Sequence, residues 1–379
     1  MHPTRQIYLP TEIVVQIVRF VAADEAHRQE ALYACCLVSR QWYSAAVSFL
    51  YEKPRLHTGN SFQLFVSTTS PGVGVRRNKL KLGSFVRRLD ISRLVHHSSN
   101  SVTARLLGRV KENLEVFVAP RVSFAVNGLP ALSKCTNLRH LDLSLVADPI
   151  PFPNLKKALS HLLRLRTLRL PRSTNLDIPD SSRTEWPPLL NKLQLSGHFS
   201  ATTIPSFSWP PALTSLSLKN CTDLSVTSIA CLLSSPQLSE TLRHLTISYA
   251  NRRLEPGSIN AVTALLPGLT YLSVPGDMVD ETFFDVLSFV SPPLALEVLE
   301  FDMPSFDPII HFETASLIMA LDKGLSNVHS IGFSDIFCTD ERILEDEEVD
   351  DVLHKHAEQR AEQGAATAVD ETEVGVYYM

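Results

Sequence analysis

The chain has 379 residues, of which 44% are hydrophobic and 20% are charged, a composition that excludes a wholly disordered protein. Its net charge of −5 is unevenly distributed, because residues 339–379 hold 13 acidic and 3 basic side chains while the remainder is mildly basic. No apolar run approaches the roughly 20 residues that cross a bilayer, and the six cysteines show no paired spacing. We therefore expect no membrane contact, reduced thiols, and a cytoplasmic or nuclear location.

The first fifty residues predict three short helices. In LPTEIVVQIVRFV, Pro10 suits the first turn of a helix, and Ile13 and Ile17 belong to an apolar stripe. A second helix follows a polar break, and Ser39 is placed to cap a third helix that carries Trp42. Three such helices bury little surface alone, so they either cap a neighbouring domain or bind a partner.

The leading Leu-Pro motif and the later stretch CLVSRQWY resemble an F-box over residues 8–54. In that family these helices dock onto a Skp-family adaptor, which links to a cullin scaffold and its ubiquitin-conjugating machinery. The resemblance implies that the adaptor interface, or the small core behind it, is formed by Leu9, Pro10, Ile13, Ile17, Leu37, Val38, Ser39 and Trp42. The alternative is a helical cap on the domain that follows.

Residues 55–85 are predicted to be a linker or cap, because they include the Ser-, Gly- and Pro-rich stretch STTSPGVGV. A basic run then extends from Arg76 to Arg88. No aromatic residues that could stack on bases are interleaved with this run in a regular way, so a solvated basic flank is favoured over nucleic-acid binding.

The pattern L-x-x-L-x-L organises most of the remaining chain. It recurs ten times between residues 86 and 333, as in NLRHLDL, RLRTLRL and GLTYLSV, with steps of 23–32 residues. This period is close to that of leucine-rich repeats. A compact α/β domain with leucine-rich strands is the alternative, but the recurrence favours a solenoid of about ten repeats over residues 86–335.

Segments between the repeats, among them SVTARLLGRV and ETASLIMAL, have the pattern of helices. A unit of one strand and one helix cannot bury its own leucines, so such units stack. The predicted fold class is therefore α/β, with an N-terminal three-helix F-box followed by a leucine-rich-repeat solenoid. A parallel β-sheet is expected on the concave side of the solenoid and helices on its convex side.

Within each predicted strand, leucines that point into the core alternate with residues that point away. We expect the outward residues to form a charged concave face that binds a protein substrate. Its predicted residues are His140, Asp142, Arg169, Lys192, Gln194, Lys219, His244, Tyr271 and Glu300. The alternative is that these positions are polar only because they are exposed to solvent.

The sequence contains no catalytic constellation that we recognise. The pairs His96-His97 and His354-x-His356 lack cysteine or carboxylate companions at metal-ligand spacing, so we expect neither a metal nor a cofactor. Cys221 ends LSLKNC, where the repeat prefers Asn or Cys, and is predicted to be structural. The charge of residues 336–379 favours a disordered acidic tail.

Together with the F-box resemblance, these features indicate a non-catalytic substrate-recognition subunit of a Skp/cullin/F-box-type ubiquitin ligase. The helical head would bind the adaptor, and the repeats would hold a protein substrate near the conjugating enzyme. A leucine-rich-repeat interaction scaffold without a ligase is the alternative. The identity of the substrate does not follow from the sequence.

Overall fold

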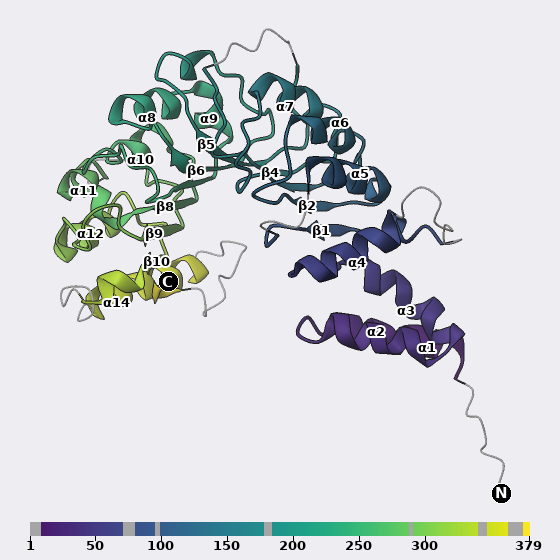
Figure 1. Ribbon diagram of the computed structural model, residues 1–379. Coiled ribbons are helices and arrows are strands. Elements are labelled where there is room, and N and C mark those ends of the chain that lie inside the picture. Colours follow the sequence, from purple (N-terminus) through teal and green to yellow (C-terminus); the bar gives the residue numbers. More distant parts are fainter. Residues whose placement is uncertain are drawn as a thin grey trace, which may run out of the picture. The chain divides into compact units, whose positions relative to one another are not determined.

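The structure is a computed structural model that describes residues 9–70, 80–94, 99–177, 184–287, 291–339, 347–362 and 374–379. The chain forms two compact units. The first unit comprises Met1–Ile150, Asn154–Arg166 and Ser182–Pro187, and the second comprises Pro151–Pro153, Thr167–Ser181 and Pro188–Met379. Figure 1 shows the order of the elements along the chain.

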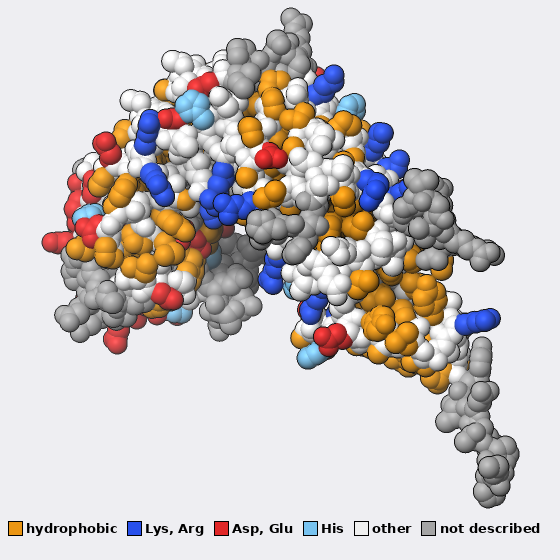
Figure 2. Space-filling view, viewed as in Figure 1, with side chains coloured by type: hydrophobic (Ala, Val, Ile, Leu, Met, Phe, Trp, Pro, Cys, Tyr) orange, Lys and Arg blue, Asp and Glu red, His pale blue; other side chains and the backbone are white. Residues whose placement is uncertain are grey.

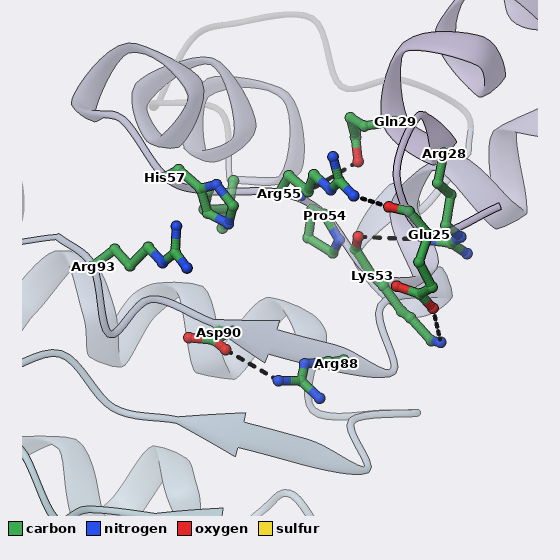
Figure 3. Close-up of a pocket in the computed structure, with 11 residues that line it drawn as sticks. Glu25, Arg28, Gln29, Lys53, Pro54, Arg55, His57, Arg88, Asp90 and Arg93 are labelled. Atoms are coloured by element: carbon green, nitrogen blue, oxygen red, sulfur yellow. Dashed lines mark hydrogen bonds and ion pairs between the residues drawn. The ribbon is translucent and has the colours of Figure 1, made fainter. Parts of the chain in front are cut away.

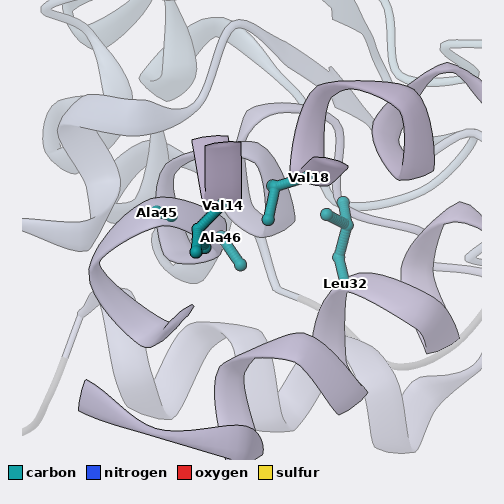
Figure 4. Close-up of a cluster of buried hydrophobic side chains, with 5 residues drawn as sticks. All are labelled: Val14, Val18, Leu32, Ala45 and Ala46. Atoms are coloured by element: carbon teal, nitrogen blue, oxygen red, sulfur yellow. The ribbon is translucent and has the colours of Figure 1, made fainter. Parts of the chain in front are cut away.

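The first unit begins with the three predicted helices, α1 (Thr11–Ala23), α2 (Arg28–Val38) and α3 (Arg40–Glu52). All three pack against one another, and their core is small. Figure 4 shows that it consists of Val14, Val18, Leu32, Ala45 and Ala46. Because two of these five side chains are alanines, the helices approach closely but bury little apolar area.

Arg28 ties the ends of the three helices together, which the sequence analysis did not predict. Its side chain is only 5% exposed. The Nε group donates to the carbonyl oxygen of Ala22 at 2.9 Å, and Nη2 donates to the carbonyl oxygen of Phe49 and to Glu52 Oε2, both at 3.0 Å. These bonds satisfy carbonyl groups that a helix leaves unpaired in its last turn, so the buried charge is compensated.

The rest of the first unit starts the repeats. Its elements are α4 (Gly59–Thr69), η1 (Leu82–Phe85), β1 (Arg88–Asp90), α5 (Asn100–Val110), β2 (Val116–Val118), η2 (Val126–Gly128), α6 (Leu129–Leu132) and β3 (His140–Asp142). Strands β1, β2 and β3 pair side by side in parallel. Arg76, Arg77 and Lys79 of the basic run, like His96 and His97, lie outside the described residues.

In the second unit, strands β4 to β11 pair in chain order and all in parallel. They are β4 (Thr167–Arg169), β5 (Lys192–Gly197), β6 (Ser215–Cys221), β7 (His244–Ile247), β8 (Tyr271–Pro275), β9 (Val298–Asp302), β10 (Ser330–Phe333) and β11 (Gly375–Tyr378). Ten strands of the two units occur where the repeat pattern predicts them, each two residues after the first apolar position.

Helical segments connect these strands. They are η3 (Ile204–Ser206), α8 (Val226–Leu233), α9 (Pro236–Thr241), α10 (Val262–Leu265), η4 (Gly276–Met278), α11 (Glu281–Leu287), α12 (Thr314–Leu321), η5 (Asp335–Thr339) and α14 (Glu347–Glu362). Helix α7 (Phe152–Leu159) precedes β4 in the chain, and most of its residues belong to the first unit. Figure 1 shows α8 to α12 on one side of the strands of the second unit. The predicted succession of parallel strands with helices on one face is therefore confirmed.

The repeat leucines form the core, as their period predicts. Leu216 of β6 and Leu245 of β7 are fully or almost fully buried, and they lie opposite each other in the strand register. Shortly after β7, Asn251 is completely buried and joins two repeats. Its side chain donates to the carbonyl oxygen of Leu218 and accepts the backbone N–H of Cys221, each at 2.8 Å.

Cys221 is a structural residue, as expected. The thiol is 1% exposed and donates to the carbonyl oxygen of Leu195, with an S···O distance of 3.6 Å. Burial raises the pKa of Cys221 to about 12, so at neutral pH it carries no thiolate and has little nucleophilic reactivity.

The prediction of a disordered acidic tail is wrong for the described part of residues 336–379. Helix α14 packs against α12 and β11, and it buries Val349, Leu353 and His356. These positions have the i, i+4, i+7 spacing of one helical face. The high average charge of the tail obscured this stripe, because the acidic residues occupy the other faces of the helix. Strand β11 then extends the sheet beyond β10.

Candidate protein-interaction sites

The N-terminal helices expose an unusual number of large apolar side chains. We call these six residues the apolar head surface: Ile13, Ile17 and Phe20 of α1, and Tyr33, Leu37 and Val38 of α2. The exposed fractions are 80% for Phe20, 69% for Leu37 and 64% for Val38. Figure 2 shows hydrophobic side chains gathered over these helices. Apolar residues scattered singly on a surface are ordinary, but a cluster of this kind marks a binding site.

Helix α1 is apolar on two sides, and this explains the surface. Val14 and Val18 are one turn apart and face the core. Ile13, Ile17 and Phe20 follow the i, i+4, i+7 spacing of a neighbouring stripe that no described residue covers completely. A helix with apolar residues around much of its circumference is usually buried on all those sides. The free side of α1 therefore has the composition of an interface.

The remaining residues predicted for the adaptor interface divide into two groups. Pro10 and Ser39 are exposed, whereas Leu9 and Trp42 are half-buried and pack against the five-residue core. The Ser39 hydroxyl accepts the backbone N–H of Trp42 at 3.3 Å, which confirms the predicted cap of α3. Leu9 and Trp42 thus pack against the core of the three helices and are not part of the apolar head surface.

The predicted set omitted Phe20 and Tyr33. Both could have been found from helical spacing alone, because Phe20 is three residues after Ile17 and Tyr33 is four residues before Leu37. Neither residue matches a position of the motif that carries the F-box resemblance.

The second candidate site is the strand face opposite the helices of the second unit. In one row across the strands, Lys192 of β5, Ser215 of β6, His244 of β7 and Tyr271 of β8 are neighbours in register. The rings of His244 and Tyr271 lie 5.7 Å apart between centroids. Burial lowers the pKa of His244, and the positive charge of Lys192 lowers it further, so the imidazole is neutral near pH 7.

The next row contains Arg169 of β4 and Gln194 of β5 in register, and further along it Glu300 of β9. Tyr271 donates its phenolic hydrogen to Glu300 Oε2, and Tyr377 of β11 donates to Glu300 Oε1 at 2.7 Å. Burial raises the pKa of both tyrosines, and the Glu300 carboxylate that accepts their hydrogens raises it further. Tyr377 belongs to the strand that the sequence analysis missed.

The other predicted face residues also point away from the core. His140 and Asp142 flank the buried Leu141 on β3 in the first unit, and Lys219 is exposed near the end of β6. The predicted alternation of buried and outward positions is therefore confirmed. That these residues bind a substrate stays a prediction.

The described residues contain neither a metal-binding cluster nor a membrane-spanning helix. No group of three or more His, Cys, Asp or Glu side chains in the described ranges could hold a metal ion. Within the same part of the chain, no helix combines the length and the apolar character needed to cross a membrane.

Comparison with known proteins supports the F-box resemblance of the head. Residues 7–57 match the F-box-like family. The F-box protein YDR306C of Saccharomyces cerevisiae is 31% identical over 268 residues, which cover 71% of this chain and 53% of that protein. The protein pof5 of Schizosaccharomyces pombe is 28% identical over 249 residues, or 65% of this chain and 68% of its own length. The chain thus matches about half the length of the first relative.

Among solved structures, the crystal structure of the Rad7 and Elc1 complex in yeast is similar, with a TM-score of 0.45 and 16% sequence identity. The similarity covers 86% of this chain and 76% of that chain.

Proposed function

We propose that this chain, whose residues 7–57 form an F-box-like domain, is the substrate-recognition subunit of a Skp/cullin/F-box-type ubiquitin ligase. In this proposal the apolar head surface binds a Skp-family adaptor, which connects the chain to a cullin scaffold. The observation that carries it is that a domain matching the F-box-like family exposes six large apolar side chains on α1 and α2. The proposed site of action is the cytoplasm or the nucleus.

The energetics of the head favour a partner. Its own core contains five buried residues, two of them alanines, whereas the apolar head surface contains six large apolar side chains, two of them aromatic. Full burial of each such side chain contributes about 1.5–3 kcal/mol. A partner that covers Phe20, Leu37 and Val38 would therefore stabilise the complex substantially, even after the cost of association.

The strand face is the proposed substrate site. The face is basic at β4 and β5, which carry Arg169 and Lys192. It becomes acidic at β9, which carries Glu300. Polar and charged side chains in register on rigid strands can distinguish partners by charge and hydrogen bonding. The chain itself would contribute binding and proximity, because the transfer of ubiquitin would take place on other subunits.

Binding to a purified Skp-family adaptor tests this proposal. We expect Leu37→Asp to weaken the affinity about 100-fold or more, because it places a charge within the proposed apolar contact. Affinity should be measured by isothermal titration calorimetry on the full chain. The matched control is Leu64→Asp on α4, since Leu64 is similarly exposed at 60% but lies outside the apolar head surface.

Two results would contradict the proposal. One is that the wild-type chain does not bind any Skp-family adaptor, which would favour an interaction scaffold without a ligase. The other is that Leu37→Asp and Leu64→Asp bind the adaptor equally well, which would place the contact elsewhere. The change at Leu37 should not unfold the head, because this side chain is 69% exposed.

A further inference from the structure

A polar cleft with a volume of about 320 Å³ opens in the first unit, between the segment after α3 and the region of β1. Figure 3 shows the side chains around it. The lining residues are Glu25, Arg28, Gln29, Lys53, Pro54, Arg55, Leu56, His57, Arg88, Asp90 and Arg93. Five of them are Arg or Lys and two are acidic, so the cleft has a formal excess of three positive charges.

We propose that this cleft binds a phosphate monoester, with Arg93 and His57 as its principal hydrogen-bond donors. The inference does not depend on the ligase proposal, because it rests on side chains outside the apolar head surface. A volume of this size is at the lower end of the range for small-molecule sites. It exceeds the volume of a single phosphate group and leaves room for the atoms that carry the phosphate.

Several of the cations in the wall are already bound to protein groups. Arg28 is buried and is held by carbonyl oxygens and Glu52. Arg55 donates to the carbonyl oxygens of Ala26 and Glu25, and Lys53 forms an ion pair with Glu25 at 3.3 Å. These residues supply positive potential and fix the shape of the wall, but most of their donors are in use.

Arg93 and His57 differ from these cations. Both side chains are exposed, and neither forms a hydrogen bond or ion pair with any residue that the structure describes. In Figure 3 they extend toward the same space from two segments, His57 from the segment after α3 and Arg93 from the turn after β1. A guanidinium group with all five donors available is well suited to the oxygens of phosphate.

The acidic residue nearest to this pair, Asp90, is compensated by its neighbours. It accepts hydrogen bonds from the Ser92 hydroxyl at 2.7 Å and from Arg88 at 3.1 Å. Burial raises the pKa of Asp90, but these hydrogen bonds outweigh burial and the pKa is lowered. Asp90 therefore stays ionised, and its charge is balanced by Arg88.

The charge and geometry select the class of ligand. An excess of positive charge repels cations, including metal ions, and gives no electrostatic attraction to neutral ligands. A carboxylate offers two oxygens, whereas a phosphate monoester offers three oxygens and nearly two negative charges at pH 7. Donors that converge from two segments are better satisfied by the larger number of oxygens.

Calorimetric titration of the full chain with inorganic phosphate, at constant ionic strength, tests the site. We expect millimolar or tighter binding to the wild type and at least tenfold weaker binding to Arg93→Gln, which removes the charge and the guanidinium donors but keeps a shorter polar side chain. The matched control is Arg105→Gln on α5, an exposed arginine of the same unit that lies outside the cleft. It should bind phosphate like the wild type.

The inference is overturned if the wild type does not bind phosphate, or if Arg93→Gln and Arg105→Gln bind it with the same affinity. Thermal unfolding of each variant should first establish that it is folded. A second titration with a phosphoserine peptide and its unphosphorylated form identifies the source of the phosphate. Phosphate-dependent binding tighter than that of inorganic phosphate supports a phosphopeptide as the source, whereas equal or weaker binding shows that the peptide adds no favourable contact and favours a small phosphorylated molecule.

Failure of this site can be distinguished from failure of the ligase proposal. The Leu37→Asp variant should lose the adaptor and keep phosphate binding, because Leu37 does not line the cleft. The Arg93→Gln variant should keep the adaptor, because Arg93 is outside α1, α2 and α3.

Discussion

The Glu300 carboxylate of β9 accepts hydrogen bonds from side chains of two other strands, and this restrains its position on the strand face. Tyr271 of β8 and Tyr377 of β11 both donate to its carboxylate. Gly332 of β10 allows this arrangement, because a Cβ at that position would lie 2.8 Å from the Tyr377 ring and 3.0 Å from Glu300 Cγ. The acidic end of the face is therefore rigid, and Glu300 is less available to a ligand than its exposure suggests.

His244 provides a test at the scale of one residue. Because burial and Lys192 lower its pKa, the unfolded chain binds this proton more tightly than the folded chain. The contribution of His244 to the free energy of unfolding is thus intact above about pH 6.5 and is lost as the pH falls through the lower, folded-state value. Lys192→Met should raise the folded-state pKa without restoring it fully, since burial remains.

Titration of the imidazole by NMR checks this prediction. Lys323→Met is the control, because this exposed lysine follows α12 and is not among the charges that act on His244. A pKa of His244 that is the same in Lys192→Met and in the wild type would contradict the assigned role of Lys192.

At the scale of elements, α14 and β11 form a cap on the strands of the second unit. Strand β11 pairs with β10 and so covers backbone groups that an edge strand would expose. Helix α14 is linked to it, since Asp350 Oδ1 accepts the backbone N–H of Val376 at 2.9 Å. Terminal elements with a polar outer surface protect the stacked core of a repeat protein in this way.

Gly375→Ala should loosen this cap. Gly375 has a φ of 110°, and an added Cβ would lie 2.5 Å from Asp350 Oδ1. We expect a loss of about 1–3 kcal/mol in the local stability of β11. Hydrogen exchange of the Val376–Tyr378 amides, measured by mass spectrometry, should be roughly 10 to 100 times faster.

Gly108→Ala is the matched control for this change. Gly108 lies inside α5, and an added Cβ would have no neighbour within 4 Å. Alanine should stabilise that helix by about 0.5–1 kcal/mol. Unchanged exchange in β11 after Gly375→Ala would show that the strand does not depend on the glycine.

At the scale of the whole molecule, stability comes from stacking between neighbouring repeats. Leucines of adjacent repeats lie opposite each other, as Leu216, Leu245 and Leu272 do across β6, β7 and β8. Each is at most 1% exposed. No single repeat buries its apolar face by itself, so a defect in one repeat should weaken the adjacent repeats most.

Leu245→Ala tests this property. Removing most of a fully buried side chain should lower the free energy of unfolding by about 2–5 kcal/mol, measured by urea denaturation. Hydrogen exchange should increase first in β6, β7 and β8. Lys219→Ala, an exposed change on β6, should leave the stability within about 0.5 kcal/mol. A uniform increase in exchange over all strands would contradict nearest-neighbour stacking.

The sequence by itself determined the repeats and the type of the head domain. The leucine period located ten strands, because a buried position in a parallel strand tolerates only apolar residues and recurs with each unit. The capping role of Ser39 and the structural role of Cys221 also followed from local patterns. The head was recognisable because its helices carry a motif, although the motif did not separate residues that pack against the core, such as Trp42, from exposed ones such as Leu37.

Only the tertiary structure decided which residues far apart in the sequence act together. Tyr377 reaches Glu300, which is 77 residues away, because β11 lies two strands from β9. The phosphate cleft joins His57 and Arg93, whose segments are unremarkable separately. The tail folds because three apolar or neutral positions of α14 face a packed neighbour, and average charge does not report where such residues point. Local patterns specify elements, whereas sites depend on distances that only packing sets.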